Sequence, residues 1–166
     1  TYLLSADVAR GDGADYSVFH VIKLETMEQV AEYQGKPSLD MYANILNQAG
    51  REYGDALLVV ENVGIGISVL EKLQDLQYPN IYYSIKGSHE YVESTVAEAS
   101  SGVVAGFTTS SKTRPLIVAK LEEFVRNKLI NLYSGRLFNE FKTFIWNNGK
   151  PQAMRSYHDD LVMCLA

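Results

Sequence analysis

The chain has 166 residues, of which 46% are hydrophobic and 21% are charged, and its formal net charge is −5. This length suits a single domain with one core, and the lack of any apolar run approaching about 20 residues excludes a membrane-spanning helix. The acidic balance argues against a protein that coats nucleic acid, because phosphate contacts need clustered Lys and Arg. A carboxylate site that holds divalent cations remains compatible with it, since the cations reverse the local charge.

The chain has one cysteine, Cys164, so it cannot form an internal disulfide, and we expect a reducing, cytosolic environment. The apolar N-terminal residues 2–8 have neither a basic flank nor a small-residue cleavage site, so no signal peptide is predicted and secretion is not expected. Both ends of the chain lie within apolar segments. We therefore expect a domain excised from a longer protein.

Three strands and a helix are predicted for the first third of the chain. An apolar run over residues 2–7 precedes a turn rich in Gly and Asp, and β-branched and aromatic residues indicate strands over residues 16–23 and 29–34. Hydrophobic residues at helical spacing then predict a helix over residues 39–53, capped by Ser38.

Further along, predicted strands alternate with helices, which indicates an α/β fold. Residues 56–61 are continuously apolar up to Glu61, as expected of a strand buried on both faces. A helix over residues 67–76 and a strand over residues 81–85 follow. Residues 86–113 lose periodicity and collect Gly, Ser and Thr over a length that is uncommon for an inert loop, so we expect a working segment there.

The last third of the chain predicts two helices and a hairpin. The helices are expected over residues 115–128 and, after a short extended piece, over residues 134–141. Residues 147–150, Asn-Asn-Gly-Lys, form a good hairpin turn between strands over residues 143–146 and 152–154, because Asn-Gly tolerates positive φ.

This hairpin carries two aromatic side chains, Phe144 and Trp146, that could stack on a DNA base. We favour packing against the core for both.

Four acidic residues stand where a metal site can form. Asp7 and Glu61 each end a predicted buried strand, and adjacent parallel strands lie about 4.8 Å apart, so neighbouring strand ends would bring both carboxylates together. Asp159 and Asp160 open a helix that is otherwise apolar on every side, so the helix must pack inside the domain with its acidic end facing another group. A cation satisfies both requirements, and oxygen ligands without a His/Cys cluster favour Mg²⁺ or Mn²⁺. Taken singly, each acid also has a structural explanation, because strand ends are exposed and helix N-termini favour negative charge.

The Gly- and Asp-rich loop over residues 7–15 permits a second interpretation. Glycines between two strands also cradle phosphate in ATPases of the sugar-kinase and actin type. The chain has no second glycine-rich nucleotide loop and no Gly-x-x-x-x-Gly-Lys-Ser/Thr motif, so no nucleotide cofactor is expected. Asp15, at the end of the loop, is either a further metal ligand or the acceptor of an Asx turn, and we favour the turn.

Three segments of the chain resemble a known family. They are residues 7–17 (DVARGDGADYS), 60–62 (VEN) and 158–162 (HDDLV). These segments are similar to the C-terminal nuclease domain of the large terminase subunit of tailed bacteriophages, particularly the T4-like ones. Residues 106–109, 112–115 and 140–141 also resemble that family's spacing between its second and third acids, so the resemblance covers nearly the whole chain.

The resemblance implies an RNase H-like fold, in which a central mixed β-sheet is flanked by α-helices and accompanied by an additional β-hairpin. It implies a Mg²⁺- or Mn²⁺-dependent endonuclease that cuts concatemeric viral double-stranded DNA during genome packaging. Asp7, Glu61 and Asp159 correspond to the family's catalytic, metal-binding acids, with Asp7 bridging two ions about 3.5–4 Å apart in two-metal hydrolysis. The helix pattern itself does not distinguish Asp159 from Asp160, so Asp160 stays a candidate metal ligand.

The family's full subunit carries an ATPase motor before the nuclease. We therefore expect residues 1–166 to be a nuclease domain whose full-length protein has an N-terminal ATPase and engages the portal and the small terminase subunit. It would act in the host cytoplasm and transiently at the viral prohead portal, without a membrane. The alternatives are another RNase H-like nuclease, such as a Holliday-junction resolvase or a transposase, and a catalytically inactive module that binds DNA or the portal.

Other charged side chains also have both a functional and a structural explanation. Lys86, Lys112 and Arg114 bracket the irregular segment and are candidate DNA-phosphate contacts, although scattered surface charge is the commoner explanation. His89 and His158 are left out of catalysis, because two-metal chemistry needs no His and a His beside an acid usually forms a hydrogen bond.

Overall fold

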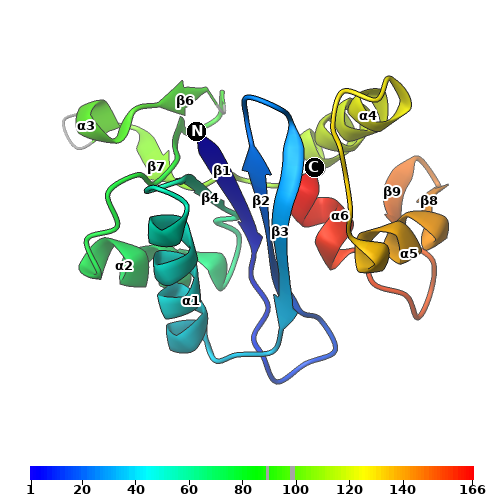
Figure 1. The fold of residues 1–166 in the computed structure, drawn as a ribbon, viewed down its shortest axis with the longest axis horizontal. Coiled ribbons are helices and arrows are strands. Elements are labelled where there is room, and N and C mark those ends of the chain that lie inside the picture. The colour runs from blue at the N-terminus through cyan, green and yellow to red at the C-terminus, as the bar shows by residue number, and fades with distance from the viewer. Residues whose placement is uncertain (89, 98–99) are drawn as a thin grey trace.

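A four-stranded mixed sheet forms the centre of the protein (Figure 1). In the computed structural model, which describes residues 1–88, 90–97 and 100–166, the strand order is β3-β2-β1-β4. The strands are β1 (Tyr2–Asp7), β2 (Ser17–Lys23), β3 (Glu28–Gly35) and β4 (Leu57–Val60). β1 runs antiparallel to β2 and parallel to β4, so β1 and β4 end at the same edge of the sheet.

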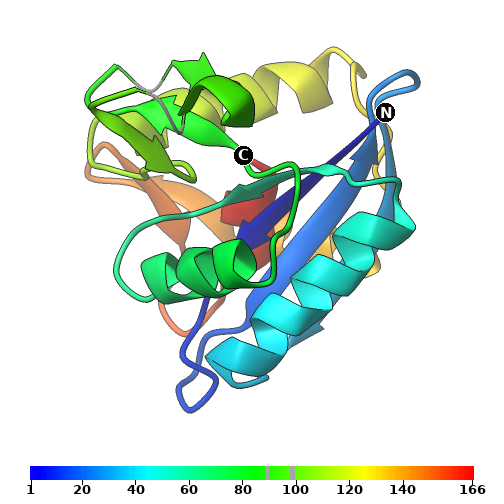
Figure 2. The same ribbon diagram turned by 90° about the vertical axis from the view of Figure 1, so that its left-hand side faces the viewer.

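Two helices, α1 (Leu39–Glu52) and α2 (Gly66–Asp75), cover one face of this sheet (Figure 2). The Ser38 hydroxyl caps α1 by accepting the Met41 amide, as the sequence predicts. Their apolar sides bury a large core against β1, β2 and β4. Its fully buried members include Leu4, Val21, Tyr42, Leu46, Leu58, Val69 and Leu73.

The C-terminal part of the chain covers the opposite face with α4 (Thr113–Arg126), α5 (Gly135–Thr143) and α6 (Asp160–Leu165) (Figure 1). A second core lies between these helices and β2, and Val18, Leu137 and Leu161 are fully buried in it. The terminal helix is therefore buried, as its uniformly apolar composition predicts.

The predicted hairpin consists of β8 (Phe144–Asn147) and β9 (Lys150–Ala153), and its prediction is confirmed. Asn148 and Gly149 take positive φ values of 50° and 77° at the turn. Phe144 packs against the second core, as expected, whereas Trp146 is 57% exposed, so the packing prediction for Trp146 is wrong. Trp146 lies two residues nearer the turn than Phe144 and is not among the residues that pack against the second core.

The segment over residues 86–113 holds more regular structure than its sequence indicates. A small sheet with the order β6-β5-β7 is formed by β5 (Tyr83–Ile85), β6 (Tyr91–Val92) and β7 (Val103–Ala105), and α3 (Ser94–Ala97) lies between the last two. Strands of two or three residues are too short to show the alternation by which strands are recognised. Phe107, in this segment, forms a single bridge with Glu61 directly after β4, and Ile81, just before β5, forms another with Leu58 of β4.

None of the helices in the described part of the chain is long and apolar enough to cross a membrane.

Candidate active site

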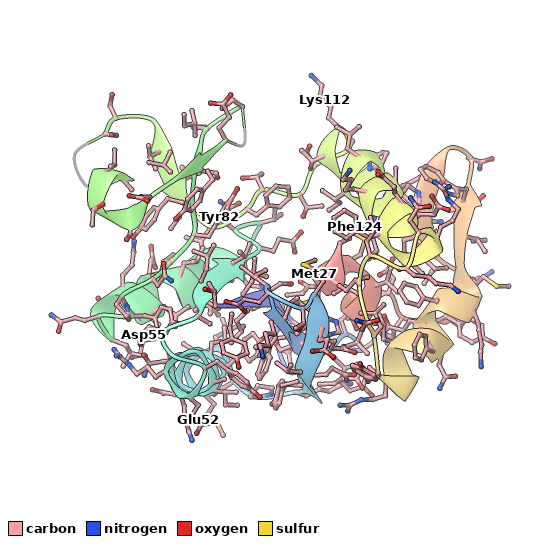
Figure 3. All side chains as sticks on the ribbon, turned by 45° about the horizontal axis from the view of Figure 1, so that its top comes forward. Met27, Glu52, Asp55, Tyr82, Lys112 and Phe124 are labelled. Carbon is pink, nitrogen blue, oxygen red and sulfur yellow. The ribbon has the colours of Figure 1, made fainter. Side chains whose placement is uncertain are left out.

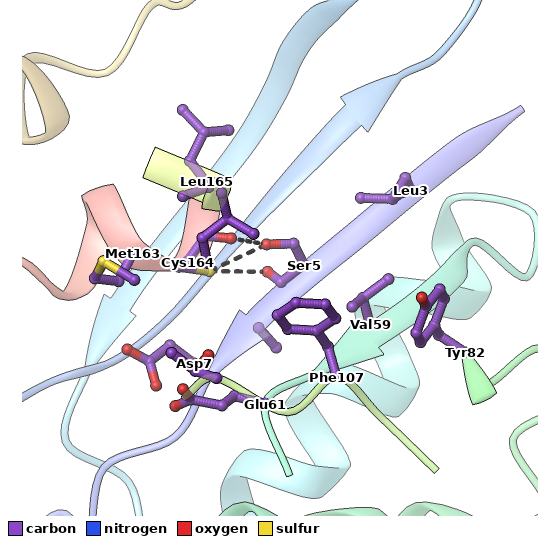
Figure 4. Close-up of a pocket in the computed structure, with 14 residues that line it drawn as sticks. Leu3, Ser5, Asp7, Val59, Glu61, Tyr82, Phe107, Met163, Cys164 and Leu165 are labelled. Atoms are coloured by element: carbon purple, nitrogen blue, oxygen red, sulfur yellow. Dashed lines mark hydrogen bonds between the residues drawn. The ribbon is translucent and has the colours of Figure 1, made fainter. Parts of the chain in front are cut away.

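Asp7 and Glu61 lie side by side where β1 and β4 end. Ala6 pairs with Val60 in the parallel ladder, and the Glu61 amide donates to the Ala6 carbonyl at 3.1 Å. The two carboxyl groups are in hydrogen-bonding contact, and Figure 4 shows them together next to Phe107. The adjacency that the sequence predicts for these two strand ends is confirmed.

The backbone that carries Glu61 is held by the residues after it. The Asn62 side-chain amide donates to the Ala105 carbonyl at 2.8 Å, and its carbonyl accepts the Thr108 hydroxyl at 2.8 Å. A Cβ at position 66 would overlap the Glu61 carbonyl oxygen, so glycine is needed where α2 begins. Sequence reasoning gave no separate role to Asn62, because its partners are 43 and 46 residues away.

Asp160 is the third acid of this group. Its residue is only 9% exposed, and its Oδ2 accepts the Tyr16 amide at 3.1 Å. Its charge is near enough to Asp7 to raise the pKa of Asp7. Asp7, Asp15 and Asp160 line one polar cleft of about 470 Å³, bounded by the loop that follows β1.

The helix that presents Asp160 is fixed by two buried side chains from other elements. The Val162 amide donates to Glu140 Oε2 at 3.0 Å, and the Leu161 carbonyl is 2.9 Å from His20 Nε2. Asp159 occupies the N-cap position of α6 but makes no capping hydrogen bond. Glu140 of α5 instead accepts an amide from the first turn of α6. The sequence does not indicate this contact, because Glu140 and Val162 belong to different helices.

Asp159 faces the hairpin. The Arg114 guanidinium donates to Asp159 Oδ2 at 2.6 Å and to the Pro151 carbonyl at 2.8 Å, and the Ala153 amide donates to the same Oδ2 at 3.1 Å. The geometry therefore favours Asp160 over Asp159 as the third metal-binding acid, in contrast to the assignment that the family resemblance implies. Arg114, a predicted DNA contact, already has its guanidinium engaged by two protein groups.

The carboxyl groups at the strand ends are electrostatically crowded. Burial, followed by the Glu61 carboxyl and the Asp160 charge, raises the pKa of Asp7 well above its usual range. Burial also raises the pKa of Asp160, although the hydrogen bond from the Tyr16 amide opposes this shift. Both shifts reflect the cost of placing negative charges together with little water. A divalent cation removes that cost, and a set of carboxylate oxygens suits Mg²⁺ or Mn²⁺.

Asp15 and His158 extend the site on the side of the loop. His158 Nδ1 is 3.7 Å from Asp15 Oδ1 and 3.6 Å from Asp160 Oδ2. One ligand atom from each of the three residues lies within 4.8 Å of the others, a spacing that can hold a metal ion. Asp15, for which the sequence favours a turn role, and His158, which the sequence leaves out, therefore both stand among the candidate ligands.

An apolar cavity of about 310 Å³ lies on the other side of Asp7 and Glu61 (Figure 4). Phe107, Ile117 and Met163 are among its lining residues. This surface lowers the local polarity next to the carboxyl groups, which favours their neutral or metal-bound forms over free anions.

The remaining predicted residues lie farther out. Lys112 is exposed at the start of α4 and projects from the surface (Figure 3). Lys86 is also exposed and lines a different cavity, together with Asn62 and residues of α2. His89 lies outside the described residues.

Comparisons with known sequences point to one group of proteins. No family model matches the chain. It is 28% identical to the large terminase subunit of Thermus phage G20c and 29% identical to that of Thermus virus P23-45, over 99% of its own length. The chain spans only 30% of the length of these curated relatives.

Solved structures give the same group. The large terminase nuclease of thermophilic phage G20c superimposes with a TM-score of 0.73 in its form with bound magnesium and 0.75 with bound cobalt, each at 19% identity. Both matches cover 99% of this chain and 77% of the other. The nuclease domain of the Thermus phage P74-26 large terminase gives 0.68 at 20% identity, with 99% and 76% covered.

These structural matches confirm the predicted fold class. A central mixed sheet flanked by helices is the architecture of the large terminase nucleases, which is the RNase H-like fold. The relatives come from Thermus phages, and the closer resemblance to T4-like phages is not confirmed.

Proposed function

We propose that this chain is the nuclease domain of a large terminase subunit and that it hydrolyses phosphodiester bonds of viral double-stranded DNA in a metal-dependent reaction. The convergence of Asp7, Glu61 and Asp160 at one edge of the sheet carries this proposal. The similarity to terminase nucleases, some of them with bound magnesium, cobalt or zinc, supports it.

Asp7, Glu61 and Asp160 are the residues that would hold the metal, which we take to be two ions, as the resemblance to terminase nucleases implies. Bound there, Mg²⁺ or Mn²⁺ would activate the attacking water and stabilise the charge on the leaving 3′ oxygen. The protein's own contribution is to keep the acids in place. The Val8 amide donates to Asp7 Oδ1 at 2.8 Å and the Tyr16 amide donates to Asp160 Oδ2 at 3.1 Å, so a backbone amide restricts the direction of each carboxylate.

The DNA and the protein partners are part of the same proposal. The exposed Lys86 and Lys112 remain candidate phosphate contacts, and Arg114 does so less readily because Asp159 engages it. In the full-length protein we place an ATPase domain beside this nuclease, with the portal and the small terminase subunit as partners in the host cytoplasm. The intact set of acids disfavours a catalytically inactive module.

Supercoiled-plasmid cleavage in Mg²⁺ or Mn²⁺ tests the nuclease. Wild type is compared with Asp7→Asn, Glu61→Gln and Asp160→Asn, and with Asp40→Asn, an exposed acid of the first turn of α1, as a matched control. We expect nicking and linearisation by wild type and the control, and background cleavage by the three site variants, because each removes an anionic ligand. Equal cleavage by all five proteins, or none by folded wild type with either metal, contradicts the proposal.

A further inference from the structure

Arg114, Asp159 and the hairpin form a junction between segments that are far apart in the sequence. Arg114 lies in the first turn of α4, Asp159 immediately precedes α6, and Pro151 and Ala153 belong to β9. The Arg114 and Asp159 side chains are 21% and 25% exposed, in contrast to the Arg126–Glu122 pair on the same helix, at 63% and 61%. An ion pair shielded from water to this extent interacts more strongly than an exposed pair.

Both hydrogen-bond donors to Asp159 Oδ2 among the described residues belong to this junction. The oxygen accepts Arg114 at 2.6 Å and the Ala153 amide at 3.1 Å, while the second donating nitrogen of Arg114 binds the Pro151 carbonyl at 2.8 Å. One carboxylate oxygen and one guanidinium thus connect the start of α4, the inner strand of the hairpin and the residue before Asp160. A planar guanidinium can make both bonds in a fixed geometry.

We infer that Asp159 is a positioning residue: with Arg114 it forms a clamp that sets the direction of the Asp160 carboxylate and fixes the β8–β9 hairpin beside the active site. The inference rests on the proposed function, because Asp160 is taken as a metal ligand there. Asp159 and Asp160 are consecutive, so a peptide unit held at Asp159 restricts where the Asp160 side chain can point. The clamp on one side and the Tyr16 amide on the other leave Asp160 directed into the polar cleft.

This assignment separates the two adjacent acids by role. Asp159 Oδ2 accepts two protein donors, one of them a charged guanidinium that neutralises the carboxylate, whereas Asp160 Oδ2 accepts the neutral Tyr16 amide and keeps its charge for a cation. Residues that orient a ligand rather than bind the metal typically change metal affinity or activity by about 10–100-fold when replaced. Because Arg114 and Asp159 act through one contact, loss of either should have the effect of losing both.

A double-mutant cycle tests the clamp. Arg114→Ala, Asp159→Asn and the double variant are compared with wild type. Arg126→Ala, which breaks the exposed Arg126–Glu122 ion pair of the same helix, is the matched control. The first readout is Mn²⁺ affinity without DNA. We expect each single variant to weaken Mn²⁺ binding by a similar factor, within about 10–100-fold, and the double variant to be no weaker than the singles. Arg126→Ala should bind Mn²⁺ as wild type does.

Two further readouts separate positioning from a general loss of stability. Hydrogen exchange of the peptide that covers residues 150–157 should quicken in all three clamp variants at temperatures well below their unfolding midpoints. Asp159→Asn leaves the Ala153 amide with a neutral, weaker acceptor, and Arg114→Ala removes the hydrogen bond to the Pro151 carbonyl. In cleavage assays kcat should fall while KM for DNA stays unchanged. Arg114→Lys keeps the charge opposite Asp159 but cannot also hold Pro151 with a planar fork, so it should restore part of the Mn²⁺ affinity.

Four results would overturn the clamp. A much larger loss of Mn²⁺ affinity in Asp159→Asn than in Arg114→Ala makes Asp159 a metal ligand. Multiplicative effects in the double variant make the two residues independent. A rise in KM for DNA alone in Arg114→Ala makes Arg114 a phosphate contact. If wild type neither binds Mn²⁺ nor cuts DNA, the proposed function fails, and unaltered exchange over residues 150–157 then refutes the clamp separately.

Discussion

The chemical role of a carboxylate near the edge of this sheet depends on the group that faces it. Asp159 faces a guanidinium, whereas Asp7 faces other carboxyl groups. The first arrangement is satisfied within the protein, and the second is relieved only by protons or by a cation. Identical side chains at adjacent positions, as in Asp159 and Asp160, can therefore have different functions.

Glu140 provides a residue-scale prediction about pH. Burial, with a smaller contribution from the Asp160 charge, raises the pKa of Glu140 to about 7 against the opposing hydrogen bond from Val162. The folded state thus keeps a proton that the unfolded state releases above its ordinary pKa of 4.5. The stability that this proton contributes is present below about pH 4.5 and is lost as the pH rises toward about 7.

We expect the free energy of unfolding of wild type, relative to Glu140→Gln, to fall by on the order of 3 kcal/mol across this pH range. Gln keeps an acceptor for the Val162 amide and does not titrate. Denaturant unfolding at a series of pH values, in EDTA, measures the difference. Glu122→Gln, which replaces an exposed acid of α4, is the control. Its free energy of unfolding should differ from that of wild type by the same amount at every pH. A constant difference between wild type and Glu140→Gln would contradict the assignment.

At the scale of elements, α6 is a helix of six residues that cannot be stable by itself. Its position is determined by contacts with β2 and α5, through His20 and Glu140. His20 is fully buried, and its Nδ1 is 2.8 Å from the Gln29 amide nitrogen, so Nε2 must donate to the Leu161 carbonyl. A single neutral ring therefore joins two strands to the helix that presents Asp160.

His20 predicts an acid sensitivity of opposite sign to that of Glu140. Burial lowers the pKa of His20 from 6.5 to about 4, so the folded state holds the ring neutral. The stability that this contributes is complete above pH 6.5 and is lost as the pH falls toward 4. Relative to His20→Gln, wild type should lose on the order of 3 kcal/mol of unfolding free energy over that range.

Unfolding of wild type, His20→Gln and His158→Gln at several pH values tests this prediction. His158 is 39% exposed in its side chain, so its replacement should leave the acid-dependent loss in place. The trend is refuted if His20→Gln shows the same acid dependence as wild type. Because the ranges for His20 and Glu140 overlap with opposite signs, wild type alone will show a weaker dependence than either variant reveals.

For the whole molecule, the crowded acids predict that metal stabilises the fold. A ligand that binds only the folded state at a concentration 100-fold above its dissociation constant adds about 2.7 kcal/mol, which raises Tm by on the order of 5–10 °C for a chain of this size. The raised pKa values of Asp7 and Asp160 mean that protons compete with the cation. The increase in Tm should therefore be larger at pH 8 than at pH 5.

Thermal unfolding with Mn²⁺, with EDTA and with NaCl of equal ionic strength measures this effect. The increase in Tm caused by Mn²⁺ should disappear after EDTA treatment and in Asp7→Asn, and it should persist in Asp40→Asn. An equal gain from NaCl would mean general charge screening of a protein with net charge −5 instead of binding at a site.

The sequence by itself determined the elements that have enough residues to show a period. The long helices, the three-stranded antiparallel arrangement of β1–β3 and the Asn-Gly hairpin all follow from local patterns. β1 and β4 are identifiable as apolar strands with an acid at or directly after their ends, although only alternate residues of β4 are fully buried. Parallel pairing of those strands then brings Asp7 and Glu61 together. The strands of two and three residues after β5 show no pattern, because their pairing depends on partners elsewhere in the chain.

Only the tertiary structure distinguishes the surroundings of the two adjacent acids, Asp159 and Asp160, on which the choice between them in the proposed site rests. Asp159 and Asp160 are adjacent, chemically identical and placed at the start of a helix that is apolar on all sides, so no periodicity separates them. Their directions are set by Arg114, 45 residues from Asp159, and by the Tyr16 amide, 144 residues from Asp160. Local patterns carry no information about such contacts, because they exist only once both sides of the sheet have been covered.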